Sequence, residues 1–133
     1  NYSENSPLKS YNFYGWTKLH SEPIVKLIKN HVVIRTRFFD KTNIKYDTAA
    51  TDIFTSAIEV QNLAREIKNI ALTKFVGVIN VGERKRSDFE NYKKFKPHIK
   101  PCKRKDIVKD LNFEIAKDAS MNLRLFRKLK REL

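Results

Sequence analysis

The sequence contains only three glycines, Gly15, Gly77 and Gly82, which do not form G-x-G-x-x-G or another glycine-rich phosphate-binding pattern. Such a loop needs glycines a few residues apart, so that the backbone can approach a phosphate closely. A nucleotide phosphate site of that kind is therefore excluded from this chain. The single cysteine, Cys102, excludes an internal disulfide, and the three histidines lack the spacing of metal ligands, so we expect no metal.

Long hydrophobic runs are also missing. No stretch approaches the roughly 18 consecutive apolar residues of a membrane span, and the chain does not open with a signal-peptide pattern. We therefore expect no membrane partner and a cytoplasmic location. With 133 residues, of which 41% are hydrophobic, the chain can form one domain with a buried core. Because it begins at Asn1 and its only methionine is Met121, we expect it to start inside a longer reading frame or to follow processing.

The chain carries a net charge of +13, and the positive excess gathers in its C-terminal part. Residues 1–82 carry 11 basic and 7 acidic side chains, whereas residues 83–133 carry 17 and 8. This excess fits an anion-attracting face or an ordinary solvated surface, and we favour the solvated surface. Nucleic-acid binding ranks last, because the sequence has no helix-turn-helix, zinc-finger or aromatic RNA-binding pattern.

Hydrophobic periodicity predicts alternating helices and strands, which favours an α/β fold over a helix bundle or a sandwich. The predicted helices span 11–30, with Pro23 kinking or dividing the helix, 58–72, 88–95 after a capping box of Ser87 and Glu90, and 122–133. The predicted strands are a buried strand at 31–36 and a second at 75–81, with a long loop at 37–55 and an extended segment at 97–105.

Three of the predicted helices carry apolar side chains along one face. These faces consist of Tyr14, Leu19, Ile24, Leu27 and Ile28 in the first helix, Ile58, Leu63, Ile67, Ile70 and Ala71 in the second, and Leu123, Phe126, Leu129 and Leu133 in the last. Ser120 or Asn122 is expected to cap the last helix.

The spacing of Tyr14 and Lys18 indicates chemistry. On a helix, residues four apart lie on the same face, so the lysine ammonium is expected near the tyrosine phenol. A nearby cation favours the phenolate form of a tyrosine, which suits it to proton transfer. Tyr14 is therefore a candidate general acid or base and Lys18 its electrostatic partner, although this spacing also fits an ordinary pair on a helix surface.

The sequence around this pair resembles a known family. Residues 12–22 read Asn-Phe-Tyr-Gly-Trp-Thr-Lys-Leu-His-Ser-Glu after Glu4 and Pro7. This order is similar to the active-site segment of the extended short-chain dehydrogenase/reductases, and within them to sugar-nucleotide reductases and epimerases of the dTDP-4-dehydrorhamnose reductase type.

Four downstream segments resemble the same family in the same order. They are the strand and aromatic loop at 33–39, the helix opening at 58–64 with Asn62 where the family has Asp, the Gly-Val-Ile-Asn-Val-Gly strand at 77–82, and the Asp-Ala-Ser before the last helix at 118–120. The resemblance thus covers nearly the whole chain.

The resemblance implies an α/β fold made of the C-terminal half of an NAD(P)-binding Rossmann-like fold and a nucleotide-sugar substrate lobe. Residues 1–36 would supply the active-site helix and the following strand, and 37–133 the substrate lobe and C-terminal helices. In a reductase of 4-keto-6-deoxy nucleotide sugars, or an epimerase, Tyr14 would protonate the keto oxygen. Tyr14 and Lys18 would also bind the cofactor, NADP or NAD, with Lys18 at its ribose, and Phe38 would contact the sugar.

Departures from the family pattern qualify the expected activity. The glycine-rich N-terminal half is absent, as is the Ser or Thr that shares the substrate oxygen with the tyrosine, and Pro23 interrupts a helix that the family continues. We therefore expect activity to need the missing half, in cis or in trans.

The alternative is a non-catalytic module that binds a sugar nucleotide or docks on a partner. The partners expected are a nucleotide-sugar substrate, the missing half and, in a homo-oligomer, a second copy.

Overall fold

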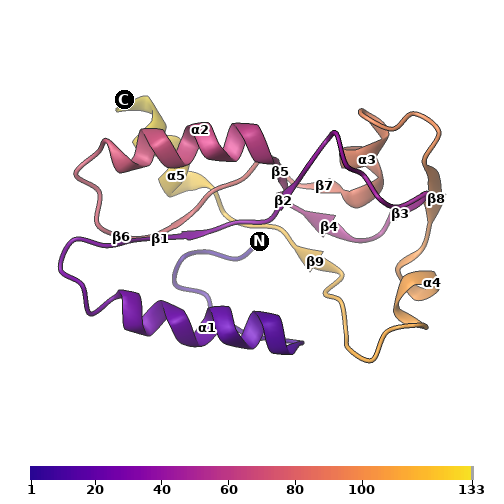
Figure 1. Cartoon of the computed structure of the whole chain (residues 1–133), viewed down its shortest axis with the longest axis horizontal. Coiled ribbons are helices and arrows are strands. Elements are labelled where there is room, and N and C mark those ends of the chain that lie inside the picture. The colour runs from indigo at the N-terminus through magenta and orange to yellow at the C-terminus, as the bar shows by residue number, and fades with distance from the viewer. Residues whose placement is uncertain (133) are drawn as a thin grey trace.

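The computed structural model describes residues 1–132, which form five helices and nine short strands (Figure 1). The helices are α1 (Phe13–Val25), α2 (Val60–Ala71), α3 (Asp88–Lys93), α4 (Arg104–Val108) and α5 (Arg124–Arg131). The strands are β1 (Val32–Arg35), β2 (Phe38–Phe39), β3 (Thr48–Ala50), β4 (Phe54–Thr55), β5 (Ile58–Glu59), β6 (Gly77–Asn80), β7 (Arg86–Ser87), β8 (Lys100–Cys102) and β9 (Asp118–Ala119). None of the helices in this part of the chain is both long and apolar enough to cross a bilayer.

One part of the molecule has three layers. β1 and β6 pair in parallel, from Val32 opposite Gly77 to Arg35 opposite Asn80. Figure 1 shows α2 and α5 on one side of this pair and α1 on the other. Parallel strands joined through a helix, with helices on both faces, are the arrangement of an α/β fold, as the sequence predicted.

The hydrophobic core lies between this sheet and the α2 and α5 layer. Its buried members are Ile58, Leu63, Ile70, Ile79, Val81 and Phe126. Leu129 and the strand residues Val32 and Ile34 pack against them. Burying such side chains contributes about 1.5–3 kcal/mol each relative to exposure, so this layer is the main source of stability.

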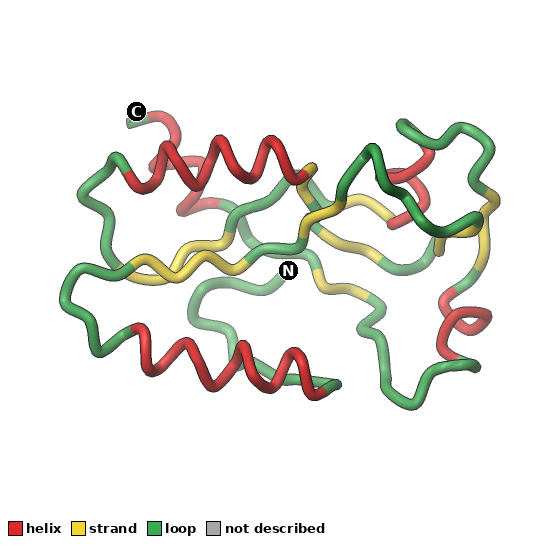
Figure 2. The backbone as a smooth tube through the Cα atoms, viewed as in Figure 1, coloured by secondary structure: helices red, strands yellow, loops and turns green. Residues whose placement is uncertain are grey.

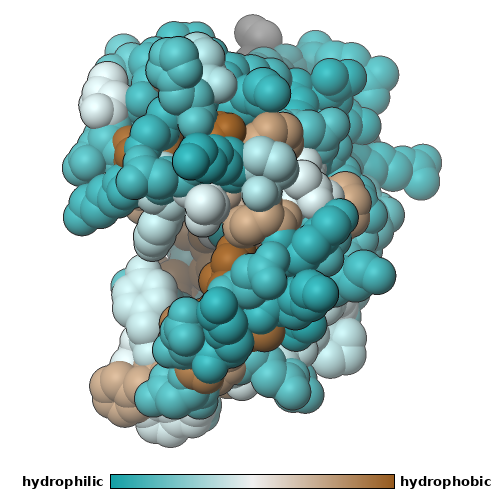
Figure 3. Space-filling model, turned by 90° about the vertical axis from the view of Figure 1, so that its right-hand side faces the viewer, coloured by the Kyte–Doolittle hydropathy of each residue, from teal (hydrophilic) through white to brown (hydrophobic). Residues whose placement is uncertain are grey.

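The rest of the chain forms three small sheets (Figure 2). β2 pairs with β5, β3 with β8, and β4 lies between β7 and β9. All of these pairings are parallel except that of β4 with β7. Seen from the end formed by α3, β8 and α4, the surface is mostly hydrophilic, with hydrophobic residues visible in a hollow between its upper and lower parts (Figure 3).

The long loop predicted at 37–55 is wrong, because this segment contains β2, β3 and β4. These strands have only two or three residues, too few to show a period of two in the sequence. They exist because each pairs with a distant segment, as when Thr48 lies opposite Lys100. The extended segment predicted at 97–105 is correct for β8, but α4 begins at Arg104, where the Asp106 carboxylate accepts a hydrogen bond from the Lys103 N–H at 3.0 Å.

The first helix differs from the prediction in two ways. Pro23 neither divides nor ends α1, which continues to Val25. Proline has no backbone N–H to donate, but the helical hydrogen bond lost for this reason lies in the last turn of α1. The apolar stripe is mostly not buried: Ile24 is 67% exposed and Leu27, beyond the helix, is 85% exposed. β1 is likewise only half-buried, because among residues 1–132 it has one neighbouring strand.

The other predicted elements are present, with two corrections. α2 buries Leu63 and Ile70 but exposes Ile67 and Ala71, and Ile58 lies in β5, because it pairs with Phe38. β6 lies within the predicted strand, and Ser87 and Glu90 form the capping box of α3. The cap predicted for the last helix is wrong: Leu123 is its N-cap residue, although Asn122 accepts a hydrogen bond from the N–H of Arg124. The expected fourth apolar position of that helix, Leu133, lies outside the described residues.

Gly82 closes β6 at a point where no side chain fits. A Cβ there would lie 2.2 Å from the backbone carbonyl oxygen of Ser56, which also accepts a hydrogen bond from the N–H of Glu83. We expect Gly82→Ala to lower the free energy of unfolding by about 2–3 kcal/mol, because two backbone segments would have to separate. Urea unfolding measures this change.

Gly15 provides the matched control. A Cβ at Gly15 meets the Ser10 hydroxyl at 2.8 Å, and that side chain can rotate away. Alanine also favours a helix, so Gly15→Ala is expected to change stability by no more than about 1 kcal/mol. Equal losses in the two variants would contradict the steric argument for Gly82.

Candidate active site at the start of α1

The start of α1 is capped by local hydrogen bonds. Asn12, in extended conformation, is the N-cap, and its side-chain oxygen accepts from the N–H of Gly15 at 2.8 Å. The Ser10 hydroxyl in turn donates to the Asn12 carbonyl oxygen at 2.7 Å. An asparagine at this position satisfies one of the free N–H groups of the first turn. The helix therefore begins at Phe13, which places Tyr14 in the first turn.

Tyr14 and Lys18 are brought together on an exposed face of α1. The Nζ atom of Lys18 lies 5.4 Å from the centroid of the Tyr14 ring. The contact is with the ring, where the sequence predicted an ammonium near the phenol oxygen. Tyr14 is 71% exposed, so its hydroxyl is accessible to a molecule docking from solvent. A cation–π contact at an exposed site contributes about 0.5–1 kcal/mol, enough to favour this side-chain geometry.

An open groove of about 490 Å³ lies at the same end of the helix. Its lining residues are Ser10, Tyr11, Asn12, Phe13 and Trp16. The rings of Phe13 and Trp16 stack at 6.1 Å, and the ring of Trp16 lies 4.0 Å from that of His20. Tyr14 and Lys18 are not among the lining residues, and at 100° per residue Phe13 and Trp16 lie on a different face of α1 from this pair.

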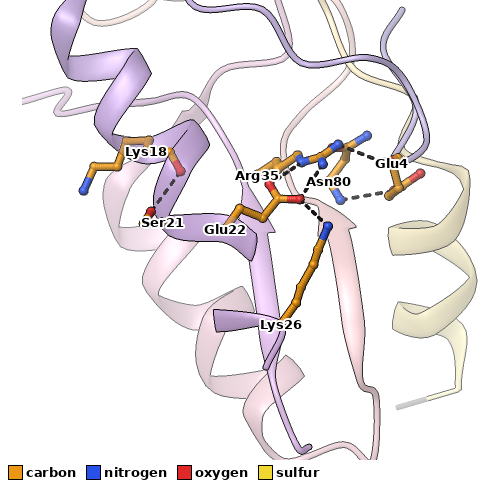
Figure 4. A network of polar contacts seen from close by, with 7 residues as sticks. All are labelled: Glu4, Lys18, Ser21, Glu22, Lys26, Arg35 and Asn80. Carbon is orange, nitrogen blue, oxygen red and sulfur yellow. Dashed lines mark hydrogen bonds and ion pairs between the residues drawn. The ribbon is translucent and has the colours of Figure 1, made fainter. Parts of the chain in front are cut away.

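A buried polar network holds α1 against the sheet (Figure 4). Arg35, the last residue of β1, donates two hydrogen bonds to the Glu22 carboxylate, from Nε at 3.0 Å and from Nη2 at 2.7 Å. Its third nitrogen donates to the Glu4 carbonyl oxygen at 2.8 Å. The Glu4 side chain accepts from the backbone N–H of Asn80 at the end of β6. One arginine thus connects α1, both strands and the N-terminal segment.

The ionisation of Glu22 depends on this network. The hydrogen bond from Arg35 holds the pKa of Glu22 below its ordinary value, against the effect of burial, and Lys26 adds to the lowering at 2.8 Å. Glu22 lies one turn after Lys18, whose side chain extends away from the network in Figure 4. The charged pair of Glu22 and Arg35 is therefore structural, and it fixes the helix that presents Tyr14.

Phe38, the predicted sugar contact, lies in β2 and is 58% exposed. Its neighbour Phe39 packs edge-on against Tyr92, with ring centroids 5.6 Å apart. Because successive side chains in a strand point to opposite faces, Phe38 projects away from that aromatic cluster. The side chain is thus available for contact with another molecule.

The segment that carries Phe38 is tied to α3. Arg37 donates from Nη2 to the Asp88 carboxylate at 3.0 Å. Burial raises the pKa of Asp88 above its ordinary value, while the ion pair with Arg37 and a hydrogen bond from Thr55 oppose that rise. This contact joins residues far apart in the sequence and steadies the strand on which Phe38 lies.

Sequence reasoning identified Tyr14 and Lys18 but gave no role to the residues that position them. Glu22, Arg35 and Asn80 lie within the segments that resemble the family, but no role was predicted for them individually. A signal was present, because an arginine at the end of a β-branched strand needs a partner if it is to be buried. The identity of its partners was not readable, since Glu22 and Glu4 lie 13 and 31 residues away from Arg35 in the sequence.

Comparison with known proteins gives matches only at the level of structure. The sequence matches no protein-family model and no curated protein. The fold is similar to dTDP-4-dehydrorhamnose reductase from Bacillus anthracis, solved in complex with NADP, with a TM-score of 0.76 and 20% identity over 96% of this chain. The dTDP-4-dehydrorhamnose reductase from Yersinia enterocolitica matches with a TM-score of 0.75 and 17% identity over 96% of this chain. A hypothetical dTDP-4-dehydrorhamnose reductase from Sulfolobus tokodaii matches with a TM-score of 0.75 and 23% identity over 100% of this chain.

These similarities establish the fold. The matches cover 52%, 53% and 52% of the three solved chains, in the same order. This chain therefore spans about half the length of the structures it matches, and it shares the α/β fold of that part of them.

Proposed function

We propose that this chain is the substrate-binding and catalytic part of an NAD(P)-dependent reductase of 4-keto-6-deoxy nucleotide sugars, of the extended short-chain dehydrogenase/reductase type. The observation that carries the proposal is the pairing of Tyr14 with Lys18 on an exposed face of α1. The shared fold supports it, since one structural neighbour is a reductase solved with NADP.

In this reaction Tyr14 acts as the general acid. Its phenol proton passes to the keto oxygen of the sugar. That oxygen gains negative charge as the carbonyl carbon accepts a hydride. Lys18 stabilises the phenolate that remains, because its ammonium lies on the same helix face. The bound dinucleotide supplies the hydride. In the reverse direction, the Tyr14 phenolate removes the hydroxyl proton.

Part of a dinucleotide site fits the residues present. The exposed ammonium of Lys18 has three donors and suits the hydroxyls of a ribose. The pyrophosphate requires a loop that the glycines of this chain do not form, because Gly15 lies far from Gly77 and Gly82 in the sequence. We propose that a dinucleotide-binding segment, from the same polypeptide or from another chain, supplies that loop.

The free edge of β1 is the place where such a segment would join. Within residues 1–132, β1 pairs with β6 alone, so its other edge carries unpaired backbone groups that can accept a further parallel strand. α1 also leaves Ile24 and Phe13 exposed. In this arrangement residues 1–36 hold the active-site helix and its strand, and the Phe38 strand belongs to the substrate lobe at 37–133.

A reconstitution assay tests the function. The chain is co-expressed with the dinucleotide-binding half of a structurally similar reductase, and NADPH oxidation is followed with a 4-keto-6-deoxy nucleotide sugar. We expect oxidation that requires both halves and the sugar. A pair that binds NADPH and the sugar nucleotide but does not oxidise NADPH would contradict the proposal.

The alternative function is a binding module without catalysis, and the missing phosphate loop is the feature that favours it. Calorimetry of the isolated chain with the nucleotide sugar separates the two. Binding by the chain alone, combined with no turnover in the reconstituted pair, would establish the module. Turnover in the pair excludes it.

A further inference from the structure

The layer formed by α2 and α5 carries a concentrated positive charge. Its two helices hold one acidic side chain, Glu66, and seven basic ones, which are Arg65, Lys68, Arg124, Arg127, Lys128, Lys130 and Arg131. The two helices therefore carry a net charge of +6, nearly half of the +13 of the whole chain. Figure 1 shows this layer on the side of the β1 and β6 pair that faces away from α1.

Four of these cations form a row along one face of α5, hereafter the α5 row. Its members are Arg124, Arg127, Lys128 and Arg131, all of them exposed. Their spacing of three and four residues places them on one side of a helix, and the row is about 10 Å long at 1.5 Å per residue. Phe126 is buried in the core on the opposite side, so α5 cannot rotate to disperse the charges.

The α5 row is not neutralised by carboxylates of the chain. No ion pair within residues 1–132 includes a member of the row. Glu66, the one acidic residue of the two helices, is bound to Lys130, which lies outside the row. The four cations therefore face solvent together, and an external anion has no internal carboxylate to displace.

The stability of α5 does not explain this arrangement. A cation near the end of a helix, such as Arg131, interacts favourably with the helix dipole, but Arg124 is the first residue of α5 and opposes it. The first turn has no acidic side chain to compensate. Each member of the row also has two like charges three or four residues away, which repel it. An anion bound along the row would relieve both effects.

The dimensions and chemistry of the row fit the phosphate backbone of a nucleic-acid duplex. One strand of a duplex carries a phosphate about every 3.4 Å along its axis, so a row of about 10 Å faces about three of them. Three of the four cations are arginines, whose planar guanidinium groups bind phosphate oxygens in pairs.

Two other anionic partners fit less well. A helix that binds a membrane inserts its apolar face among the lipids, whereas the apolar face of α5 is occupied by the core through Phe126. Single-stranded nucleic acid is held by bases that stack on exposed aromatic rings. Phe126 is the only aromatic residue of α2 and α5, and it is buried.

We propose that the α5 row binds the phosphate backbone of duplex nucleic acid without reading its base sequence. Contacts to phosphates alone carry no sequence information. Sequence considerations favoured a solvated surface for the basic residues as a whole, and the row is the part of that surface that the fold aligns. The row lies across the sheet from Tyr14 and Lys18, so this binding is independent of the proposed reductase activity.

Fluorescence anisotropy of labelled duplex DNA, titrated with the chain, tests the proposal. With two unrelated duplexes of about 20 base pairs we expect equal affinities, and a log–log slope of affinity against salt concentration of about −3. No binding at about 50 mM salt, or a clear preference for one sequence, would overturn the proposal. Tighter binding to phosphatidylserine vesicles or to polyglutamate at the same salt concentration would overturn it in favour of a lipid or an acidic protein.

A pair of double variants shows whether the row itself is responsible. Arg127→Gln with Lys128→Gln removes two exposed cations of the row, so affinity for the duplex is expected to fall roughly 10- to 100-fold at low salt and the salt slope to flatten by about 2.

The matched control is Arg84→Gln with Lys109→Gln, which removes the same charges at exposed positions outside α2 and α5. It should change affinity by less than about 3-fold, because the affinity depends on the phosphates that are contacted. Equal losses in the two double variants would show that net charge alone attracts the duplex, and would overturn the assignment to α5. If the first double variant does not fold, Arg124→Gln alone replaces it, with Arg84→Gln as its control.

Discussion

Replacing Tyr14 with phenylalanine is expected to lower the turnover number of the reconstituted reductase by about 10²–10⁴-fold, the range for loss of a positioned general acid. The change removes only the phenol oxygen. The ring remains over Lys18, and the 71% exposure of Tyr14 means that little buried contact is lost. We therefore expect the KM for the nucleotide sugar and the unfolding midpoint to stay nearly unchanged.

The matched control is Tyr46→Phe. Tyr46 also carries an exposed phenol, but it lies between β2 and β3, outside the helix that holds Lys18. Its variant should retain turnover, measured as NADPH oxidation under saturating sugar nucleotide. If Tyr14→Phe turns over as fast as Tyr46→Phe, then Tyr14 takes no part in proton transfer.

Replacing Arg35 with methionine is expected to destabilise the chain by about 3 kcal/mol at neutral pH, at the lower end of the range for breaking a buried ion pair. The substitution leaves the Glu22 carboxylate, which is 8% exposed, without its two strongest donors. Lys26 still reaches Glu22 at 2.8 Å, which limits the loss. The free energy of unfolding is measured in urea, with the exposed Arg65 of α2 changed to methionine as control.

The pH dependence of that loss has a definite sign. Arg35 lowers the pKa of Glu22 in the folded chain, so the stability it contributes is present above the unfolded-state pKa of about 4.3. It disappears as the pH falls through the lower pKa of the folded state. The difference in the free energy of unfolding between the original chain and Arg35→Met should therefore become smaller as the pH falls from neutral to acidic. A difference that is constant with pH, or equal to that of Arg65→Met, would contradict the assigned role.

The Tyr14 and Arg35 experiments both concern α1, the first its proposed chemistry and the second its attachment to the sheet, and they give separable results. Tyr14→Phe is expected to change the chemistry without changing stability, whereas Arg35→Met is expected to change stability directly. If the network positions α1 for catalysis, Arg35→Met should also reduce turnover under conditions where the protein remains folded. The Arg35 side chain acts through Glu22, and the sugar does not contact it in the proposed site.

Local sequence was sufficient where the physical cause is local. The capping box of Ser87 and Glu90 was predicted correctly because its two partners lie within one helical turn. The helical pairing of Tyr14 with Lys18 follows from the same geometry. Short strands such as β3 were missed, because they are stabilised by pairing with residues about fifty positions away and carry no period of their own.

Sequence periodicity also overestimated burial in α1. It places Ile24 on an apolar stripe, yet Ile24 lies on a helix face that no described element covers. Periodicity reports which side chains share a face, but burial depends on what packs against that face. The same limit applies to Glu59, which is 3% exposed although nothing in its local pattern indicates burial.

The sequence by itself determined the helices and strands that form the sheet, the tyrosine and lysine four residues apart, and the absence of a glycine-rich phosphate loop. Each of these depends on neighbours in the chain. Only the tertiary structure decided which charged and polar groups are buried together, as with Arg35, Glu22 and the Glu4 carbonyl oxygen. Those properties depend on groups that meet across the fold, because desolvation makes each buried charge or polar atom dependent on partners that are far away in the sequence.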